Sequence, residues 1–336
     1  MRTLKSSISL LLVLLLLVSA VACAKKQDGP DASLNLRVMV LNGTTGFGMA
    51  KLMNDHKNGK AALNYTFTTE ASGETVIKAL INGSVDIAAL PTNAAAKVYQ
   101  KTNGGVQILA LNTLGVLYVV ANGETETVTD LASLRGKTVY CPADNPALIF
   151  TAICMAAGFK IGEDITIDTS YAEPAKLRSA VAAGEVSLAV LPEPMVTIAM
   201  KANTALTSPI DLTAEWDKYY APGSLAQGCI VVRTEFAAAH PAEIEAFLQE
   251  YAASIAFLGE DTKKAAELIV EEGIFAGNAP IVEAAIPKCN VCFLDGEAMK
   301  VGMETYLGIL KGINANAIGG DLPADDFYYV RSNNTK

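Results

Sequence analysis

Histidine is scarce in this chain, with His56 and His240 as the two copies among 336 residues. His56 lies in the polar stretch NDHKNG, which is typical of a helix end, and His240 precedes a proline at a predicted helix start. The sequence also has no GxSxG elbow, no HExxH pair and no paired metal-ligand spacing. We therefore expect no enzyme, no metal site and no cofactor, although residue counts alone leave a carboxylate-based hydrolase open.

Positive charge is sparse as well. The chain has 26 Lys and Arg against 35 Asp and Glu, which gives a net charge of -9 and a pI near 4.9. An acidic chain of this kind is unsuited to nucleic acid and to an anionic membrane surface. Only 18% of the residues are charged and 51% are hydrophobic, which excludes the disordered class and predicts large cores.

Cysteine is infrequent, with six copies. Cys141, Cys154 and Cys229 stand in apolar surroundings, which favours buried thiols. Cys289 and Cys292 form a CxxC pair, but the second ligand pair of a zinc site and the context of a thioredoxin-like protein are both missing. Two interpretations stay open for this pair: a disulfide, or two partly buried thiols.

The first residues have the pattern of an export signal, with a basic start, an apolar run and small residues before Cys23. The apolar run is too short for a comfortable membrane span. The end of this segment resembles a bacterial lipobox, although Ala20 stands where leucine is commonest. We expect a signal peptide over residues 1–22, lipidation of Cys23 and a flexible tether over residues 23–33. Ordinary signal cleavage is the alternative.

Beyond residue 34, short apolar runs of β character alternate with segments of helical periodicity. This alternation predicts an α/β fold with mostly parallel sheets that are covered on both faces. From residue 243 onward the pattern is mainly helical. The β-type runs are 36–41, 65–69, 86–90, 106–111, 117–121, 138–141, 165–169, 188–191 and 228–233.

An internal repeat indicates two related lobes. When the chain is compared with itself at an offset of 101 residues, GSVDIAALP at 83–91 falls on GEVSLAVLP at 184–192, with five identities in nine positions. The glycine-rich loop at 42–47 then falls on ADNPAL at 143–148. Both loops lie where a strand gives way to a helix, so we expect them at equivalent places in the two lobes.

Four strand-to-helix loops form the candidate ligand site: 43–48, 90–93, 142–146 and 191–194. In open parallel sheets, ligands bind beyond the carboxyl ends of the strands, where helix N-termini offer unpaired N–H groups. Two loops come from each half of the repeat, which predicts a cleft with two facing walls. The residues that we expect to contact a ligand are Thr44, Thr45, Gly46, Phe47, Ser72, Thr92, Asn93, Asp144, Asn145, Tyr171 and Glu193.

The first of these loops, GTTGFG, fits a nucleotide site poorly. Its spacing, GxxGxG, reverses the dinucleotide fingerprint, and the lysine of a Walker loop is missing. Gly43 and Gly46 could instead supply positive φ in a plain turn. In the functional interpretation Thr44 and Thr45 offer hydroxyls and Phe47 offers a ring face.

The other loops also have structural interpretations. Thr92 or Asn93 could simply cap the helix that follows the proline before them. Glu193 stands between two prolines that restrict its backbone, so it is either a solvated residue, a ligand contact or part of a lobe-closing hydrogen bond.

Residues 72–94, SGETVIKALINGSVDIAALPTNA, resemble a helix, a strand and a ligand-facing loop of the solute-binding proteins of ABC importers. LASLRGKTV at 131–139 resembles the opening of their second lobe. The chain is similar to type II periplasmic binding proteins, nearest to the nitrate, sulfonate, taurine and thiamine-precursor group.

This resemblance implies two lobes that close on a ligand, and a helical C-terminal segment. The first lobe would span residues 34–122 and 228–330, and the second 123–227, with crossings at 117–122 and 228–233. The resemblance also implies a monomer, a permease and ATPase subunits as partners, and a place on the outer face of the cell membrane or in the periplasm, held by the lipid on Cys23. Nucleic acid is not an expected partner.

Charge guides the choice of ligand. The four loops carry no Lys or Arg but include Asp144 and Glu193, and Phe47, Phe150 and Tyr171 stand nearby. This predicts a neutral or cationic nitrogenous ligand, such as a pyrimidine or thiamine precursor, held by stacking and carboxylate hydrogen bonds. Two helix N-termini can also hold an oxyanion without a cation, so a sulfonate, taurine or nitrate ligand stays open. A non-transport extracellular sensor is a further alternative.

Overall fold

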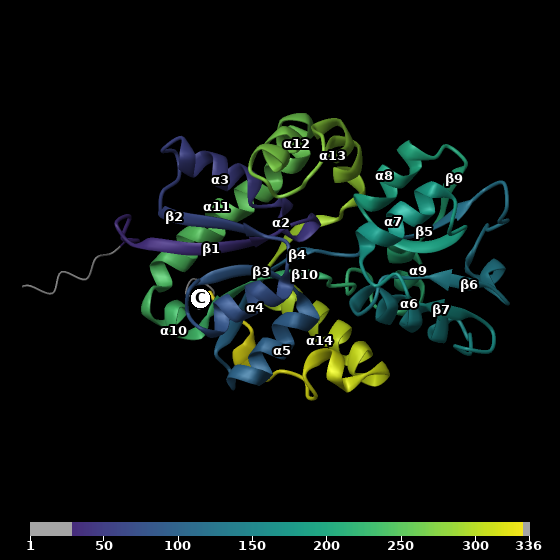
Figure 1. Ribbon diagram of the computed structural model, residues 1–336. Coiled ribbons are helices and arrows are strands. Elements are labelled where there is room, and N and C mark those ends of the chain that lie inside the picture. Colours follow the sequence, from purple (N-terminus) through teal and green to yellow (C-terminus); the bar gives the residue numbers. More distant parts are fainter. Residues whose placement is uncertain (1–28, 332–336) are drawn as a thin grey trace, which may run out of the picture.

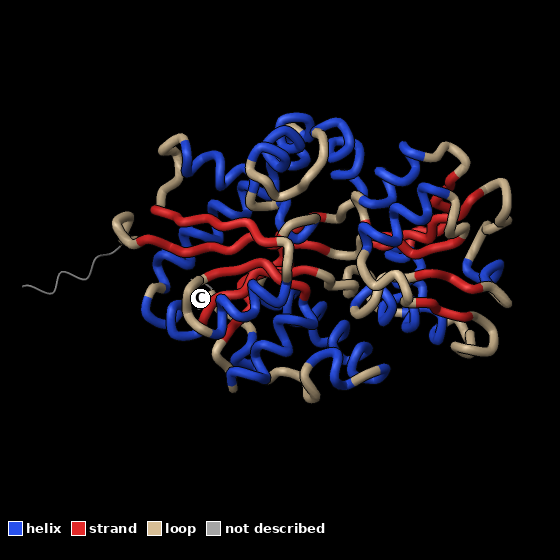
Figure 2. Tube along the Cα trace, in the orientation of Figure 1, coloured by secondary structure: helices blue, strands red, loops and turns tan. Residues whose placement is uncertain are grey.

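The computed structural model describes residues 29–331. The predicted signal peptide and Cys23 lie outside the described residues. Two α/β lobes lie side by side, each with its own sheet, and Figure 1 shows the second lobe in teal at the right. Figure 2 shows the strands gathered into these two groups, with helices around each. The prediction of a two-lobed α/β fold is confirmed.

The first sheet has six strands in the order β11-β4-β10-β3-β1-β2. β1 runs parallel to β2 and β3, while β10 runs antiparallel to β3 and β4. All its strands except β10 and β11 come from the first third of the chain. The strands are β1 (Asn35–Leu41), β2 (Asn64–Glu70), β3 (Ile87–Pro91), β4 (Val106–Thr113), β10 (Gly228–Arg233) and β11 (Val291–Leu294).

The second sheet has five strands in the order β7-β6-β8-β5-β9. β6 runs parallel to β7 and β8, and β5 runs antiparallel to β8 and β9. The strands are β5 (Leu117–Asn122), β6 (Thr138–Tyr140), β7 (Thr166–Asp168), β8 (Leu188–Pro192) and β9 (Leu206–Asp211).

The two sheets repeat one topology, as the internal repeat predicted. The run β2-β1-β3-β10-β4 in the first sheet corresponds to β7-β6-β8-β5-β9 in the second, and the fourth strand of each run is antiparallel to the third. β3 and β8 lie 101 residues apart, the offset found in the sequence. The offset therefore reflects a structural correspondence between the lobes.

The first chain crossing lies earlier than we predicted. β5 pairs with β8 and β9, so residues 117–122 belong to the second sheet and not to the first lobe. The crossing is the short segment 114–116 between β4 and β5. Gly123, which follows the predicted crossing, lies at the far end of β5, where its N–H donates to the carbonyl of Ala205. An apolar run predicts a strand but does not say which sheet receives it.

Nine helices cover the first sheet in the described residues: α2 (Thr44–Phe47), α3 (Ala50–Lys57), α4 (Gly73–Ile81), α5 (Thr92–Thr102), α10 (Thr234–Ala239), α11 (Pro241–Glu260), α12 (Thr262–Glu271), α13 (Ala279–Ala285) and α14 (Gly296–Ile313). Those of the second lobe are α6 (Asn145–Ala156), α7 (Pro174–Ala183), α8 (Met195–Ala202) and α9 (Leu212–Tyr219). Four short 3-10 helices complete the described part: η1 (Leu131–Leu134), η2 (Ile286–Lys288), η3 (Ala315–Ile318) and η4 (Asp325–Phe327). The late part of the chain is mainly helical, as predicted, but β11 was missed because its four residues are too short to show a period.

Helix α14 connects the two lobes through their cores. Its buried residues Met299 and Tyr306 join one hydrophobic cluster with Phe150 of α6 and Trp216 of α9. The rings of Trp216 and Tyr306 lie 5.8 Å apart. This shared core joins α14 of the first lobe to α6 and α9 of the second. No helix within residues 29–331 is long and apolar enough to cross a membrane.

Candidate functional site

A cavity of about 330 Å³ lies between the lobes. Its walls are α5 of the first lobe, α6 of the second lobe and the turn at η3 that follows α14. The cavity brings together Asn93 and Asp144, two of the residues predicted from separate loops. Its polar lining residues are Asn93, Lys97, Asp144, Thr151, Asn314 and Asn316.

The first wall comes from one face of α5. Asn93 and Lys97 are four residues apart, so their side chains lie one above the other on the helix. Asn93 is nearly buried, and its Nδ2 donates to the carbonyl of Ala317 at 3.4 Å. This bond ties α5 to the η3 turn, which adds Asn314 and Asn316 to the same cavity.

The second wall begins at Asp144, the N-cap of α6. Its φ is 60° and its ψ is -124°, a conformation with positive φ that residues other than glycine seldom adopt. The carboxylate forms no capping bond with its helix, and the residue is exposed. Asp144 therefore keeps its oxygens free to accept bonds from a molecule in the cavity.

The cavity combines opposite charges from opposite lobes. Lys97 contributes a cation from the first lobe, Asp144 contributes an anion from the second, and asparagine amides supply both donors and acceptors. Such a lining suits a small polar solute with groups of both kinds. Its aliphatic residues Ala147 and Leu148 of α6 leave room for a hydrocarbon part.

The glycine-rich loop forms the short helix α2 and is largely buried. Gly43 takes a φ of 99°, and its N–H donates to the carbonyl of Ile274 at 3.0 Å. The carbonyl of Thr45 accepts a bond of 2.9 Å from Nδ2 of Asn112. Backbone groups of the loop are thus used in fixing it to its own lobe. Thr44 and Thr45 are half-buried, so their hydroxyls are not sealed in the core.

The prediction that Phe47 and Phe150 offer their rings to a ligand is wrong. Phe47 is fully buried and meets Phe275 edge-on, with ring centroids 6.4 Å apart. Phe150 is also fully buried, in the cluster that joins the lobes. Both rings occupy buried positions of a helix. The apolar periodicity of a helix does not show whether an apolar side chain faces the core or a cleft.

Thr92 anchors the second chain crossing. Its N–H donates to the carbonyl of Gln227 at 3.1 Å, and its hydroxyl donates to the carbonyl of Ala226 at 2.5 Å. The side-chain oxygen of Gln227 accepts from the N–H of Val116 at 2.7 Å. These bonds join the segments before β5 and before β10, where the lobes meet.

Glu193 forms a contact between the lobes. Its carboxylate accepts from the N–H and the hydroxyl of Thr197 at 3.1 and 3.0 Å, and its side chain is fully buried. Nζ of Lys288, from the first lobe, lies 3.9 Å from Oε1. Burial raises the pKa of Glu193, and the Thr197 bonds and Lys288 partly offset this. Burial excludes the solvated alternative for Glu193; its hydrogen bonds go to Thr197 of its own lobe, and its contact with the first lobe is the ion pair with Lys288.

Two other predicted residues make structural bonds and do not line the cavity. Ser72 is exposed and caps α4, with its oxygen 3.4 Å from the N–H of Thr75. Asn145 accepts a 2.7 Å bond from the buried hydroxyl of Tyr306, which fixes the start of α6 to α14.

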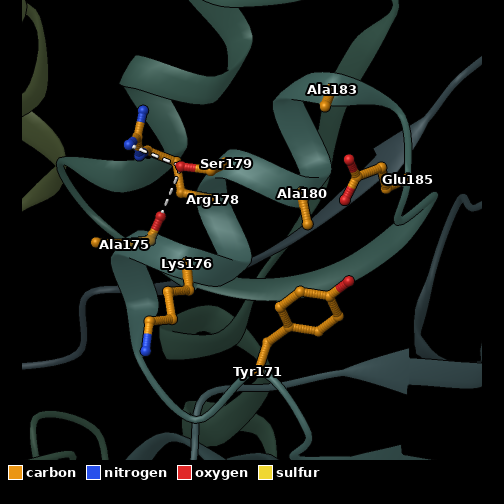
Figure 3. Close-up of a pocket in the computed structure, with 8 residues that line it drawn as sticks. All are labelled: Tyr171, Ala175, Lys176, Arg178, Ser179, Ala180, Ala183 and Glu185. Atoms are coloured by element: carbon orange, nitrogen blue, oxygen red, sulfur yellow. Dashed lines mark hydrogen bonds between the residues drawn. The ribbon is translucent and has the colours of Figure 1, made fainter.

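Tyr171 lines a different cavity, of about 620 Å³, on the second lobe alone. Figure 3 shows its ring beside α7, with the charged ends of Lys176, Arg178 and Glu185 spread around the helix and not converging on one point. Tyr171 is therefore not brought together with Asn93 and Asp144.

Cys289 and Cys292 are free thiols, so the disulfide alternative is wrong. Cys289 is buried at the end of η2, and its thiol points to the carbonyl of Ala285 at 3.2 Å. Cys292 lies in β11, and burial raises its pKa to about 12. No cluster of metal-ligating side chains occurs within residues 29–331.

Lys97, Lys288 and the two asparagines of the η3 turn were missed in the sequence. Lys97 carries a usable signal, since it follows Asn93 by four residues on a predicted helix. Asn314 and Asn316 carry no such signal, because they lie more than 160 residues along the chain from Asp144 and Thr151. Their place in the site is set by the packing of α14.

The comparisons with known proteins agree with this geometry. The family described as the substrate binding domain of ABC-type glycine betaine transport systems matches residues 59–272, more than half of the chain. The chain belongs to this family and has the type II periplasmic binding protein fold. It is thus a substrate-binding protein of ABC-type import, a class whose members bind small solutes and interact with a permease.

Solved structures share the fold over most of the chain. An ABC transporter protein from Parabacteroides distasonis has 22% identity and a TM-score of 0.74, covering 90% of this chain and 100% of its own. The periplasmic aliphatic sulphonate binding protein SsuA from Escherichia coli has 14% identity and a TM-score of 0.70, covering 89% and 92%.

A third similar structure is the zinc-bound ligand-binding component of an ABC-type import system from Staphylococcus aureus. It has 15% identity and a TM-score of 0.68, covering 88% of this chain and 97% of its own. No curated protein sequence matches the chain.

Proposed function

We propose that this protein captures a small nitrogen-containing organic solute in the cavity between α5 and α6 and delivers it to a membrane permease. The observation that carries the proposal is that Asn93 of the first lobe and Asp144 of the second line one cavity of about 330 Å³. A solute N–H or ammonium group would donate to Asp144, while its acceptors would take bonds from Lys97 or the amides. Because the walls belong to different lobes, the solute itself would stabilise their closed arrangement.

The finer choice of a pyrimidine or thiamine precursor has weaker support than the broader class. The choice of a heteroaromatic ligand depended on stacking with aromatic rings, but Phe47 and Phe150 are buried in the core. The cavity lining offers hydrogen bonds and aliphatic surface, so we propose a compact polar solute ahead of a stacked heteroaromatic one.

A sulfonate, taurine or nitrate ligand is the second candidate. Lys97 is the observation that favours it, since a cation in the cavity can pair with an oxyanion. A solved structure with the same fold is an aliphatic sulphonate binding protein, which makes this class a natural comparison.

The setting outside the cell is also part of the proposal. The export pattern before Cys23 supports a protein held at the outer face of the membrane by a lipid, working as a monomer with permease and ATPase subunits. A sensor without transport duty would use the same cavity, and loss of solute uptake after deletion of the gene would distinguish the importer.

Thermal-shift assays with two ligand panels test the proposal, since a bound solute stabilises the folded protein. We expect stabilisation by small amines or amide-bearing solutes, lost in Asp144→Asn and retained in Lys101→Gln, an exposed site one turn beyond Lys97. Stabilisation by alkanesulfonates alone, lost in Lys97→Gln, would establish the second candidate. Ligand binding unaffected in both variants would contradict the proposed site.

A further inference from the structure

A third cavity, of about 450 Å³, is lined by residues of the first lobe alone. It is bounded by the end of α3, by the edge strand β2 and by the residue that ends α12. It shares no residue with the cavity between the lobes. The residues that matter are Met53, His56, Lys57, Phe67, Thr69 and Glu272.

Glu272 is an unusual residue for this position. Its side chain is 1% exposed, and Oε2 pairs with Nζ of Lys57 at 2.6 Å. Oε1 is buried and has no hydrogen-bond partner among the described residues. The residue is the C-cap of α12, where the helix dipole disfavours a negative charge. A buried carboxylate oxygen without a donor is costly, and nothing in the packing of the lobe explains it.

Aromatic rings form the wall beside this carboxylate. Tyr65 and Phe67 project from the same face of β2 and stack with centroids 5.0 Å apart. His56 meets Phe67 edge-on at 5.9 Å. Tyr65 is buried and its hydroxyl donates to Glu250 at 2.7 Å, whereas Phe67 is only half-buried. Phe67 therefore has ring surface left for a partner.

We propose that this cavity is a second ligand site, for a small uncharged planar molecule that carries an N–H donor. The donor would satisfy Oε1 of Glu272, and the flat apolar part would lie on Phe67. The ligand is uncharged because Lys57 already balances the carboxylate. Lys57 is 57% exposed, so its side chain can shift to admit the ligand while Nζ stays paired with Oε2.

Benzamide and N,N-dimethylbenzamide are a matched pair of probes, since they share the ring and carbonyl while the second lacks N–H. We expect titration of the full chain with benzamide to shift amide signals of α3, β2 and Glu272 in NMR spectra. N,N-dimethylbenzamide should bind about tenfold more weakly, because it cannot form the charge-assisted hydrogen bond with Glu272. In Glu272→Leu, which removes the acceptor oxygens, this preference between the probes should disappear.

Phe67→Ala should weaken binding of both probes, and Thr68→Ala, on the other face of β2, should change neither. Thermal melts identify variants that fail to fold. The ratio of the two probe affinities is measured on the wild-type protein, so this part of the test does not depend on the folding of a variant. Equal binding of the two probes, no shifts at all, or shifts confined to α5 and α6 would each overturn the proposal. The last result would still agree with the main site between the lobes.

Discussion

Single side chains decide how the two lobes hold together. Glu193 of the second lobe is fully buried beside Lys288 of the first, and the carbonyl of Lys288 accepts a 3.1 Å bond from the hydroxyl of Tyr118. Asn145 starts α6 and is bonded to Tyr306 of α14. Both contacts join the two lobes, so substitutions at these residues test how the lobes hold together and do not remove a residue that lines the ligand cavity.

The titration of Glu193 should affect stability. Burial raises its pKa, so the folded protein holds this proton more tightly than the unfolded chain does. The resulting stabilisation is fully present below the ordinary pKa of 4.5 and is lost as pH rises through the folded-state pKa. We expect the free energy of unfolding of the wild type to fall relative to Glu193→Gln over that interval. Chemical denaturation from about pH 4 to about pH 7 measures this difference; a difference independent of pH would contradict it.

The Asn145–Tyr306 bond gives a second prediction at the residue scale. Asn145→Ala leaves the buried hydroxyl of Tyr306 without its acceptor, which should lower the free energy of unfolding by about 1–3 kcal/mol. Tyr306→Phe should recover part of that loss when combined with Asn145→Ala, because the orphaned hydroxyl is gone. A double-mutant cycle measured by urea denaturation checks this. Additive effects of the two substitutions would refute the coupling.

Thr45→Ala, by contrast, should leave stability close to that of the wild type. The carbonyl of Thr45 makes the bond to Asn112, and this bond does not depend on the side chain. If the α2 hydroxyls contribute to the ligand site, as the sequence predicted, Thr45→Ala weakens solute binding while the melting temperature is unchanged. Calorimetric titration with the solute found in the thermal-shift panels measures this effect. Unchanged affinity would show that the Thr45 hydroxyl does not contribute to solute binding.

At the scale of single elements, the glycines of α2 illustrate how a loop is held in place. A Cβ at Gly46 would clash with the carbonyl oxygen of Leu41 and would lie 2.8 Å from Cγ2 of Ile274. The backbone therefore passes so close to β1 and to residue 274 that no side chain fits. The repeated glycines of GTTGFG are explained by this close approach and by the positive φ of Gly43.

Gly46→Ala should accordingly destabilise the protein by roughly 2–4 kcal/mol, because the clash involves backbone that cannot move cheaply. Gly73→Ala is the matched control, since its Cβ would meet nothing within 4 Å at the start of α4. The control should be neutral or slightly stabilising, as alanine is the better helix former. Thermal unfolding of both variants measures the contrast. Equal melting temperatures would show that α2 can shift away from β1.

Elements differ in how well their sequence predicts them. β3 and β8 were predicted with their repeat, because a continuous apolar run that ends in proline is a local signal. The sheet that receives β5 was not predicted, since pairing partners lie far along the chain. Residue pairs on one helix, such as Asn93 and Lys97, were within reach of sequence reasoning, whereas the asparagines of the η3 turn enter the cavity only through tertiary packing.

The whole molecule is two similar lobes in contact on both sides of the crossings. α14 packs against α6 on one side, and Nζ of Lys201 on α8 donates to the carbonyl of Pro280 on α13 at 3.2 Å on the other. Proteins of this fold open and close as rigid lobes around short crossings. Glu193 and Lys288 come from different lobes, so an opening of the lobes would separate them.

Lys288→Ala should shift the unliganded protein toward the open state. Closure would then bury Glu193 without its cation, which we expect to disfavour the closed form by about 1 kcal/mol, or roughly fivefold. Small-angle X-ray scattering should give a larger radius of gyration for the unliganded variant. Excess ligand should return it to the wild-type value, and a variant as compact as the wild type without ligand would contradict this role of Lys288.

The central claim is that a solute binds between α5 and α6. Native mass spectrometry of freshly purified protein tests it most directly, with wild type, Asp144→Ala and the Lys101→Gln control prepared in parallel. The account predicts an added mass of one small nitrogen-containing solute on the wild type and the control, and a strongly reduced bound fraction on Asp144→Ala. A solute retained equally by all three proteins would contradict it.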